Sequence, residues 1–285
     1  MRKFAELQAS AAQLIYHTLS AEWHEFSTKP RRVQALLGAY RYLMQWRYRL
    51  AQVSPIQIGI GIPMDPERFR ATIDEHGPNY DRIGRVGRLR ANCVWNETGR
   101  VFTGGEITPA YRIMLEYGKA AESRFAHSGL TGDVLNNPVR LPDGSTVVGN
   151  RLVRGAAARD IACDLVARVA RRGGDTRHIE TGGDPIYAVT ADNAARSEIF
   201  SCAIDLLAGA EFGDVAAWQQ ARFLLYQSPK MKKGSDSVIR TFLVAVGAIL
   251  FERPRILVHD VDLRCLVLGQ DSATVMPHDL ELCSG

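Results

Sequence analysis

The stretch SDSVIRTFLVAVGAILF, residues 235–251, constrains the fold more than any other part of the chain. Apolar residues surround the axis of the helix predicted here on nearly all sides, which leaves no polar face for water. Such a helix has to be enclosed by other elements, and a chain of 285 residues is long enough to enclose it. We therefore predict a mainly α-helical, single-domain protein built around a central buried helix.

Other segments show the three-and-four spacing of apolar residues that is typical of amphipathic helices. Helices are predicted on this basis at 4–26, 31–50, 107–127, 156–172, 192–208 and 215–227, with a short one at 66–76. Asp192 or Thr190 is the expected N-cap of the helix at 192–208. Two small β pieces are expected beside these helices. One is a strand in IQIGIGIP (56–63), and the other is a hairpin that turns at Pro142-Asp143-Gly144.

A lysine-rich loop between Pro229 and Gly234 opens directly into the apolar helix. The first-turn N–H groups of a helix have no intrahelical partners, and a phosphate gains hydrogen bonds there. We predict an anion site formed by three lysines, the turn and one arginine: Lys230, Lys232, Lys233, Gly234, Ser235 and Arg240. The alternative is a solvated basic loop in which Ser235 caps the helix and Asp236 complements its dipole.

Candidate acid–base groups follow from two further segments. Asp262 lies in VHDVDLR, just after the central helix; it either caps the next helix or orients a hydroxyl and acts as a base. His178 lies in the polar run 173–189, which is predicted to be a loop. The sequence contains no HExxH, no paired cysteines and no glycine-rich phosphate loop between a strand and a helix. No metal site is therefore predicted.

Segment 77–106 has no clear period and is the most basic part of the chain. It carries five arginines: Arg82, Arg85, Arg88, Arg90 and Arg100. Its GRVGRLR run looks like a phosphate loop without the strand and helix that such loops need. Phosphate or an acidic partner could bind there, and a solvated surface is the alternative. The formal net charge of the whole chain is only +4, which does not favour nucleic acid as a partner.

The expected compartment follows from cysteine usage and hydropathy. The five cysteines are scattered and odd in number, which fits reduced thiols in a cytoplasm. No window approaches 18 uncharged apolar residues, so no membrane span is predicted. The N-terminus lacks the apolar core and cleavage site of a secretory signal. Delivery by a specialised secretion machine would leave no mark in such a sequence.

The order of hairpin, helix, polar loop, two helices, Pro-to-Gly loop, central helix and Asp-containing turn resembles the Fido superfamily, in its AvrB-like form. Fic members carry HPFxxGNGRxxR, whereas the stretch here is SPKMKKGSDSVIR, with Ser228 at the place of the catalytic histidine. AvrB-like members also lack that motif, and Pro229, Gly234-Ser235 and Pro254 match their pattern. The similarity covers roughly residues 136–270. Residues 1–135, a helical N-terminal part, have no counterpart.

The resemblance implies a nucleotide-dependent transferase that moves a glycosyl or related group from a nucleotide or nucleotide-sugar donor to a hydroxyl of a protein or small molecule. It implies donor phosphates on Lys233, Gly234 and Ser235, with Asp262 and His178 at the sugar or the acceptor. The hairpin tip would be a flap that holds the target by strand addition, formed by Leu141, Pro142, Asp143 and Gly144. Without the Fic histidine, AMP transfer is not expected. A non-catalytic effector module of the same fold and a basic nucleic-acid binder remain alternatives.

Overall fold

The structure is a computed structural model, and it describes residues 2–23, 28–53, 65–277 and 279. The chain is mainly helical and carries a small antiparallel sheet. The strand predicted at 56–63 lies outside the described residues. Among the described residues, no helix has both the length and the apolar character needed to cross a membrane.

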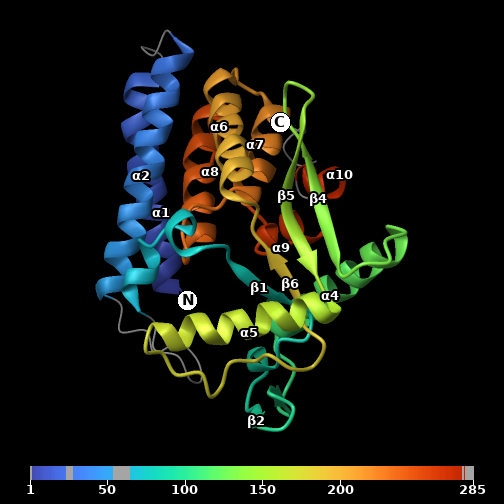
Figure 1. The fold of residues 1–285 in the computed structure, drawn as a ribbon. Coiled ribbons are helices and arrows are strands. Elements are labelled where there is room, and N and C mark those ends of the chain that lie inside the picture. Colours follow the sequence, from blue (N-terminus) through green and yellow to red (C-terminus); the bar gives the residue numbers. More distant parts are fainter. Residues whose placement is uncertain (1, 24–27, 54–64, 278, 280–285) are drawn as a thin grey trace.

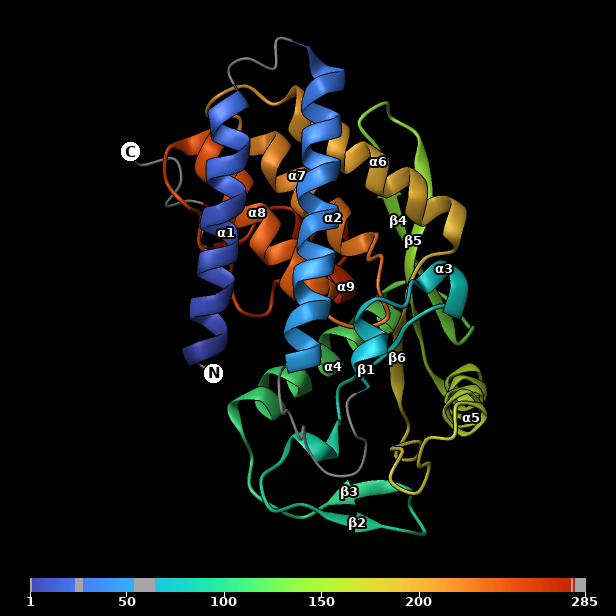
Figure 2. The ribbon, with the colours of Figure 1, turned by 90° about the vertical axis from the view of Figure 1, so that its left-hand side faces the viewer.

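A bundle of helices surrounds the central helix α8 (Ser235–Phe251), as the sequence predicts (Figures 1 and 2). The helices α1 (Arg2–Trp23), α2 (Lys29–Val53) and α7 (Val215–Gln227) pack against it, and α6 (Asn193–Gly209) packs against α2 and α7. All five helices contribute side chains to one apolar core, in which Phe242, Leu243 and Val246 of α8 are fully enclosed. Burial of these residues on all sides of α8 stabilises the bundle.

Aspartates define where α6 and α7 begin. The Asp192 carboxylate accepts from the Ala195 N–H at 2.9 Å, and Asp214 accepts from the Ala217 N–H at the same distance. Asp192, rather than Thr190, is therefore the cap of α6. The predicted short helix at 66–76 is two pieces, the 3₁₀ turn η1 (Pro66–Phe69) and α3 (Ile73–His76).

The sheet has four antiparallel strands in the order β1–β6–β5–β4. Their bounds are β1 (Tyr80–Ile83), β6 (Ile186–Val189), β5 (Thr146–Val153) and β4 (Val134–Arg140). One face packs against α4 (Pro109–His127) and α9 (Val261–Val267), and the other against α5 (Gly155–Arg171). Because β1 pairs with β6, residues before and after position 136 share this sheet.

The predicted hairpin is confirmed as β4 and β5, and the Leu141 N–H donates to the Ser145 carbonyl across its turn at 2.8 Å. It differs from a free-standing flap, because β5 also pairs with β6 through three registered residues. The strand β6 was not expected: the run 173–189 was predicted to be a loop. All four residues of β6 are buried, so it lacks the period-two pattern that marks a half-exposed strand.

Smaller elements complete the chain. The basic segment 77–106 contains β1, the turn η2 (Gly87–Leu89) and a separate hairpin, β2 (Val94–Asn96) with β3 (Val101–Thr103). The short helix α10 (Gln270–Ala273) lies beside β4, where Gln270 exchanges hydrogen bonds with the Arg140 backbone. This contact fixes the outer strand of the sheet to the C-terminal part of the chain.

A candidate functional site at the start of helix α8

The lysine loop is fixed at both ends before it enters α8. Met231 bridges to Thr72, and Ser235 exchanges hydrogen bonds with the Met231 backbone at 3.2 and 3.1 Å. Gly234 then turns the chain with φ of 82°, in the left-handed region where glycine is favoured. A Cβ at this position would also stand 2.9 Å from Arg47 and from Phe69, so no other residue fits without a shift.

The helix cap differs from the one in the alternative interpretation, in which Ser235 caps the central helix. Gly234 is the N-cap of α8, and it offers no side chain to the first-turn N–H groups. Ser235 is the first helical residue, and its hydroxyl closes the loop on Met231 instead. The positive end of α8 therefore keeps donors that an anion can accept from.

The three lysines of the loop separate in space. Lys230 Nζ lies 4.2 Å from the centre of the Phe200 ring on α6, so this lysine belongs to the bundle. Lys232 Nζ donates to the Gly77 and Pro78 carbonyls, each at 2.8 Å, and holds the chain that enters β1. Lys233 is exposed and makes no hydrogen bond or ion pair within the described part of the chain. Only Lys233 is free to meet a ligand with its whole ammonium group.

Lys233 belongs to a group of charges from four separate segments, which we name the α8 charge cluster. Its members are Arg68 of η1, Asp81 of β1, Arg88 of η2, and Lys232 and Lys233 of the loop. Desolvation raises the pKa of Asp81, and the two lysines, Arg88 and Arg68 act against that rise. Asp81 is nevertheless exposed, so water still reaches a carboxylate that many protein atoms surround.

The buried carboxylate of Glu180 positions Arg88. The Glu180 side chain is almost fully buried; its Oε1 accepts from the Gly87 N–H at 2.7 Å. Its Oε2 lies 3.6 Å from Arg88 Nη1. Gly87 has no room for a side chain, because a Cβ would stand 2.2 Å from the Phe102 carbonyl oxygen. The turn η2 is thus clamped, and Arg88 extends from it toward the cluster.

Asp262 lies in the first turn of α9, where it interacts with Asp236 and Arg240 of α8 and, within the α8 charge cluster, with Asp81. Its pKa is raised to about 6, mainly by desolvation and also by the Asp236 carboxylate and, less, by Asp81, while a backbone hydrogen bond from Leu263 and the Arg240 guanidinium act against the rise. It is not a helix cap: the N-cap position of α9 belongs to Asp260, which accepts from the Tyr117 hydroxyl at 2.6 Å. The Asp262 carboxylate makes no side-chain hydrogen bond or ion pair within the described chain, and its pKa is suited to proton transfer near neutral pH.

Arg240 was expected to offer its guanidinium to an anion, and the structure shows a different use. Its Nε donates to Asp236 at 2.9 and 3.1 Å, and its two Nη atoms donate to the Val258 and His259 carbonyls at 2.8 and 2.6 Å. These contacts occupy every edge of the guanidinium. Arg240 fastens the chain after α8 back to its first turns, and it thereby sets the position of α9 and of Asp262.

Two predicted parts of the site lie elsewhere in the molecule. His178 packs against Trp95, with ring centres 5.4 Å apart, on the small hairpin β2–β3. Figure 2 shows this hairpin at the lower end of the molecule, with α9 near its middle. The hairpin tip formed by Leu141, Pro142, Asp143 and Gly144 lies at the end of β4–β5 that points away from α3 and the lysine loop (Figures 1 and 2). Neither part makes a hydrogen bond, ion pair or ring contact with a residue of the α8 charge cluster within the described chain, although β3 packs against the turn η2 that carries Arg88.

The arginine-rich segment does not form one basic surface. Arg82 is buried and donates to the carbonyls of Arg85, Glu180 and Gly182. Arg90 donates to the Gly105 carbonyl and Arg100 to the Thr176 carbonyl, which ties their loops together. Only Arg88 of these residues joins the cluster. This distribution does not favour the nucleic-acid alternative, which needs a shared basic face.

The cluster combines cations that can neutralise a phosphate with a carboxylate of raised pKa. Sequence reasoning found Lys233 and Asp262, and it missed Asp81 and Arg68. The only signal available for Asp81 was its position next to a basic run, because the four residues of β1 show no alternation of apolar and polar side chains. No group of three or more His, Cys, Asp or Glu side chains among the described residues could hold a metal ion.

Comparison with known proteins does not assign the chain to a family. No family model matches the chain, and no curated protein matches it.

Proposed function

We propose that the chain is a nucleotide-dependent transferase, which moves a glycosyl or related group from a nucleotide-sugar-type donor to a hydroxyl acceptor. One observation carries the proposal: exposed Lys233 stands with Arg68 and Arg88 around Asp81, at the uncapped start of α8, with Asp262 close by. Cations beside free helix N–H groups suit a diphosphate, and a carboxylate of raised pKa suits proton transfer.

In the proposed reaction the acceptor oxygen bonds to the anomeric carbon of the donor, while the bond from that carbon to the diphosphate breaks. The electron pair leaves with the diphosphate, whose growing charge is stabilised by Lys233, Arg88 and the first-turn N–H groups. Asp262 takes the proton of the acceptor hydroxyl. Because burial and Asp236 raise the pKa of Asp262 to about 6, it is a stronger base than an ordinary aspartate.

The position of Ser228 supports transfer of a glycosyl or related group rather than Fic-type transfer of AMP. Ser228 occupies the place of the Fic histidine in the resemblance to the Fido superfamily. Its side chain is fully buried, and its hydroxyl donates to the Leu224 carbonyl at 2.7 Å. A hydroxyl held in this way has no proton-accepting role toward a substrate. The AvrB-like form of the fold, with Asp262 as the acid–base group, is therefore the arrangement that we propose.

Titration calorimetry with a panel of nucleoside diphosphates and nucleotide sugars tests donor binding. We expect at least one member to bind, and Lys233→Ala to weaken it about tenfold or more, because a charge-assisted contact to phosphate is lost. Lys119→Ala is the matched control, because Lys119 is also exposed but lies on α4. If no member of the panel binds at millimolar concentration, the proposal is wrong.

The catalytic half is tested separately with Asp262→Asn. Donor binding should persist within about threefold, whereas transfer to acceptor hydroxyls and hydrolysis of the donor by water should fall about 100-fold or more. Mass spectrometry of candidate acceptors and release of the nucleoside diphosphate report the turnover. Donor binding without turnover by the wild type would instead support a non-catalytic module.

A further inference from the structure

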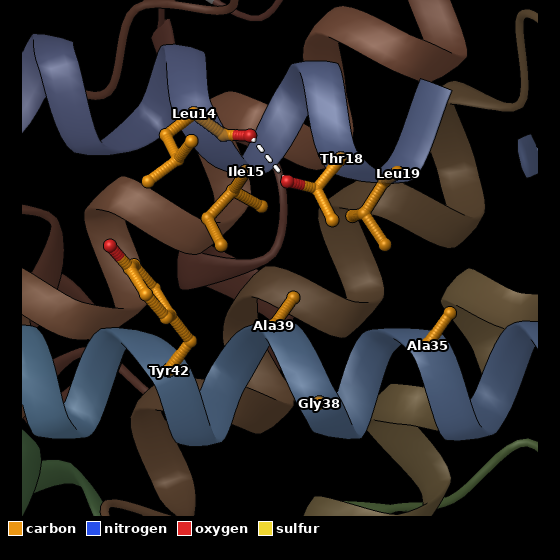
Figure 3. A pocket seen from close by; sticks show the side chains of 8 residues that line it. All are labelled: Leu14, Ile15, Thr18, Leu19, Ala35, Gly38, Ala39 and Tyr42. Atoms are coloured by element: carbon orange, nitrogen blue, oxygen red, sulfur yellow. Dashed lines mark hydrogen bonds between the residues drawn. The ribbon is translucent and has the colours of Figure 1, made fainter. Parts of the chain in front are cut away.

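A second feature, remote from the α8 charge cluster, is an apolar groove between α1 and α2. Both helices pack against α8, and the groove between them has a volume of about 340 Å³. Figure 3 shows its lining side chains turned toward one another from the two helices. The groove is lined by Leu14, Ile15, Thr18 and Leu19 of α1 and by Ala35, Gly38, Ala39 and Tyr42 of α2.

The walls of this groove are suited to an apolar guest. A Cβ added to Gly38 would meet no atom within 4 Å, so the backbone of α2 lies open at the middle of the groove. Leu14 keeps 47% of its surface exposed at the rim. The Thr18 hydroxyl donates to the Leu14 carbonyl at 2.9 Å, as the dashed line in Figure 3 shows, so its proton already has an acceptor. Apolar side chains can therefore enter without leaving that hydroxyl unsatisfied.

The positive charge of α2 indicates which class of ligand the groove would bind. This helix contains Lys29, Arg31, Arg32, Arg41, Arg47 and Arg49, and no acidic residue. Arg31 lies one turn before Ala35, and Arg49 lies two turns after Tyr42, so both stand on the groove side of α2. Both are exposed. An apolar groove with a cation toward each end is complementary to a helix whose polar flanks are acidic.

We propose that the groove between α1 and α2 binds an acidic amphipathic helix of a partner protein. The guest would lay apolar residues at i, i+3/i+4 and i+7 along Gly38 and Leu14, with its carboxylates toward Arg31 and Arg49. A second copy of this chain seated on the same face would bring one cationic α2 against another, which like charges oppose. This proposal is independent of the transferase proposal, because none of its residues belongs to the α8 charge cluster.

A displayed library of helices tests the proposal with the full-length protein as bait. Each member has about five turns, a fixed leucine stripe and polar positions randomised among Asp, Glu, Lys, Arg and Ser. We expect selection to enrich Asp and Glu at those positions. Fluorescence anisotropy with an enriched peptide should then show binding that weakens about tenfold or more in Gly38→Phe, and again in Arg31→Glu with Arg49→Glu.

Controls separate this site from the alternatives. Arg112→Glu with Arg159→Glu reverses two exposed arginines on α4 and α5 and should leave binding unchanged, as should Lys233→Ala. Thermal melts show whether each variant is folded, and the arginine pair reports independently of Gly38→Phe. Enrichment without acidic bias, or binding that neither variant weakens, overturns the proposal. It is also overturned by a dimer in light scattering that Gly38→Phe dissociates, or by anionic vesicles that displace the peptide.

Discussion

Two groups of charged side chains in this protein differ in their burial and in the hydrogen bonds that they make within the chain. In the first, Arg222 of α7 is 1% exposed and donates to both oxygens of Asp279, at 2.8 and 2.7 Å, and to the Thr274 carbonyl at 2.7 Å. The Met276 N–H also donates to Asp279 at 2.6 Å. In the second, the α8 charge cluster, Lys233 and Arg88 are exposed, and Asp81 accepts no hydrogen bond within the described chain.

Charged groups of the first kind stabilise the fold, whereas those of the second kind are available to a ligand. In the pair Arg222–Asp279 both Nη atoms of the guanidinium and both carboxylate oxygens have partners, and only Arg222 Nε lacks one among the described residues; the pair ties the segment after α10 to the helical bundle. The α8 charge cluster is incomplete on its own, and its cations are held by residues behind them, as Glu180 holds Arg88. Substitutions should therefore act on stability in the first group and on ligand binding in the second.

The largest expected effect is that of Asp279→Ala, which breaks the buried pair. It leaves the Arg222 guanidinium buried without its counter-charge, and we expect the free energy of unfolding to fall by about 3–5 kcal/mol. Urea denaturation followed by tryptophan fluorescence measures the loss. The double variant Arg222→Met with Asp279→Leu removes both charges and should lie closer to the wild type. A loss below about 1 kcal/mol in Asp279→Ala would contradict this assignment.

Asp262→Asn should have the next largest effect, with the opposite sign. The pKa of Asp262 is about 6 in the folded protein, above the ordinary value of about 4 in an unfolded chain. The protonated form therefore stabilises the fold below pH ~4, and this stability is lost as the pH rises through about 6. The neutral asparagine avoids that loss, so the variant should gain about 1–3 kcal/mol at neutral pH.

Thermal melts of wild type and Asp262→Asn between pH 4 and 8 test this sign. The difference in melting temperature should grow as the pH rises from 4 to 6 and then level off. Asp143→Asn is the control, because hydrogen bonds from Ser145 lower the pKa of Asp143, and this variant should bring no such gain. A difference that does not change with pH would show that Asp262 is not the titrating group.

A smaller effect is expected from Lys232 on ligand binding. Desolvation and neighbouring arginines lower its pKa to about 8. Affinity for a nucleoside diphosphate should therefore fall about fivefold as the pH rises from 7 to 9, because the ammonium loses its proton. Lys232→Arg stays charged over this range and should not show the fall. Calorimetry across the pH series measures it, and an equal fall in both proteins would assign it to another group.

The smallest effect is the one on stability of Lys233→Met. Lys233 is exposed and forms no ion pair within the described chain, so its removal should change the free energy of unfolding by no more than about 0.5 kcal/mol. Lys230→Met removes the contact with Phe200 and should cost more, about 1 kcal/mol. Equal losses of unfolding free energy in the two variants would show that Lys230 does not stabilise the fold more than Lys233 does.

Sequence patterns predicted the helical part of the fold well, because each helix carries its own signal. The apolar circumference of 235–251, the cap at Asp192 and the Pro-Asp-Gly turn at 142–144 are all local features. The strands β1 and β6 were missed. Each has four residues, and their pairing joins Ile83 to Ile186 across more than 100 positions, which no local pattern records.

The candidate site was predicted in part for the same reason. Lys233 and Asp262 were found because they lie just before and just after the central helix in sequence. Asp262 returns to the first turns of α8 only because Arg240 donates to the Val258 and His259 carbonyls, which the sequence does not record. Asp81 and Arg88 reach the cluster only because β1 pairs with β6 and because Glu180 clamps η2. The packing of His178 against Trp95 was not predicted, since a polar loop of that length gives no direction to its side chains.

The sequence by itself determined that α8 is buried, that a cationic loop opens it, and that an acid follows it. These are properties of neighbouring residues, which the period and the caps of one helix express. Only the tertiary structure decided which charges are free. Lys230, Lys232 and Lys233 look alike along the chain, yet Phe200 takes the first and the carbonyls of Gly77 and Pro78 take the second. Lys233 is left for a ligand because partners distant in sequence have already satisfied the others.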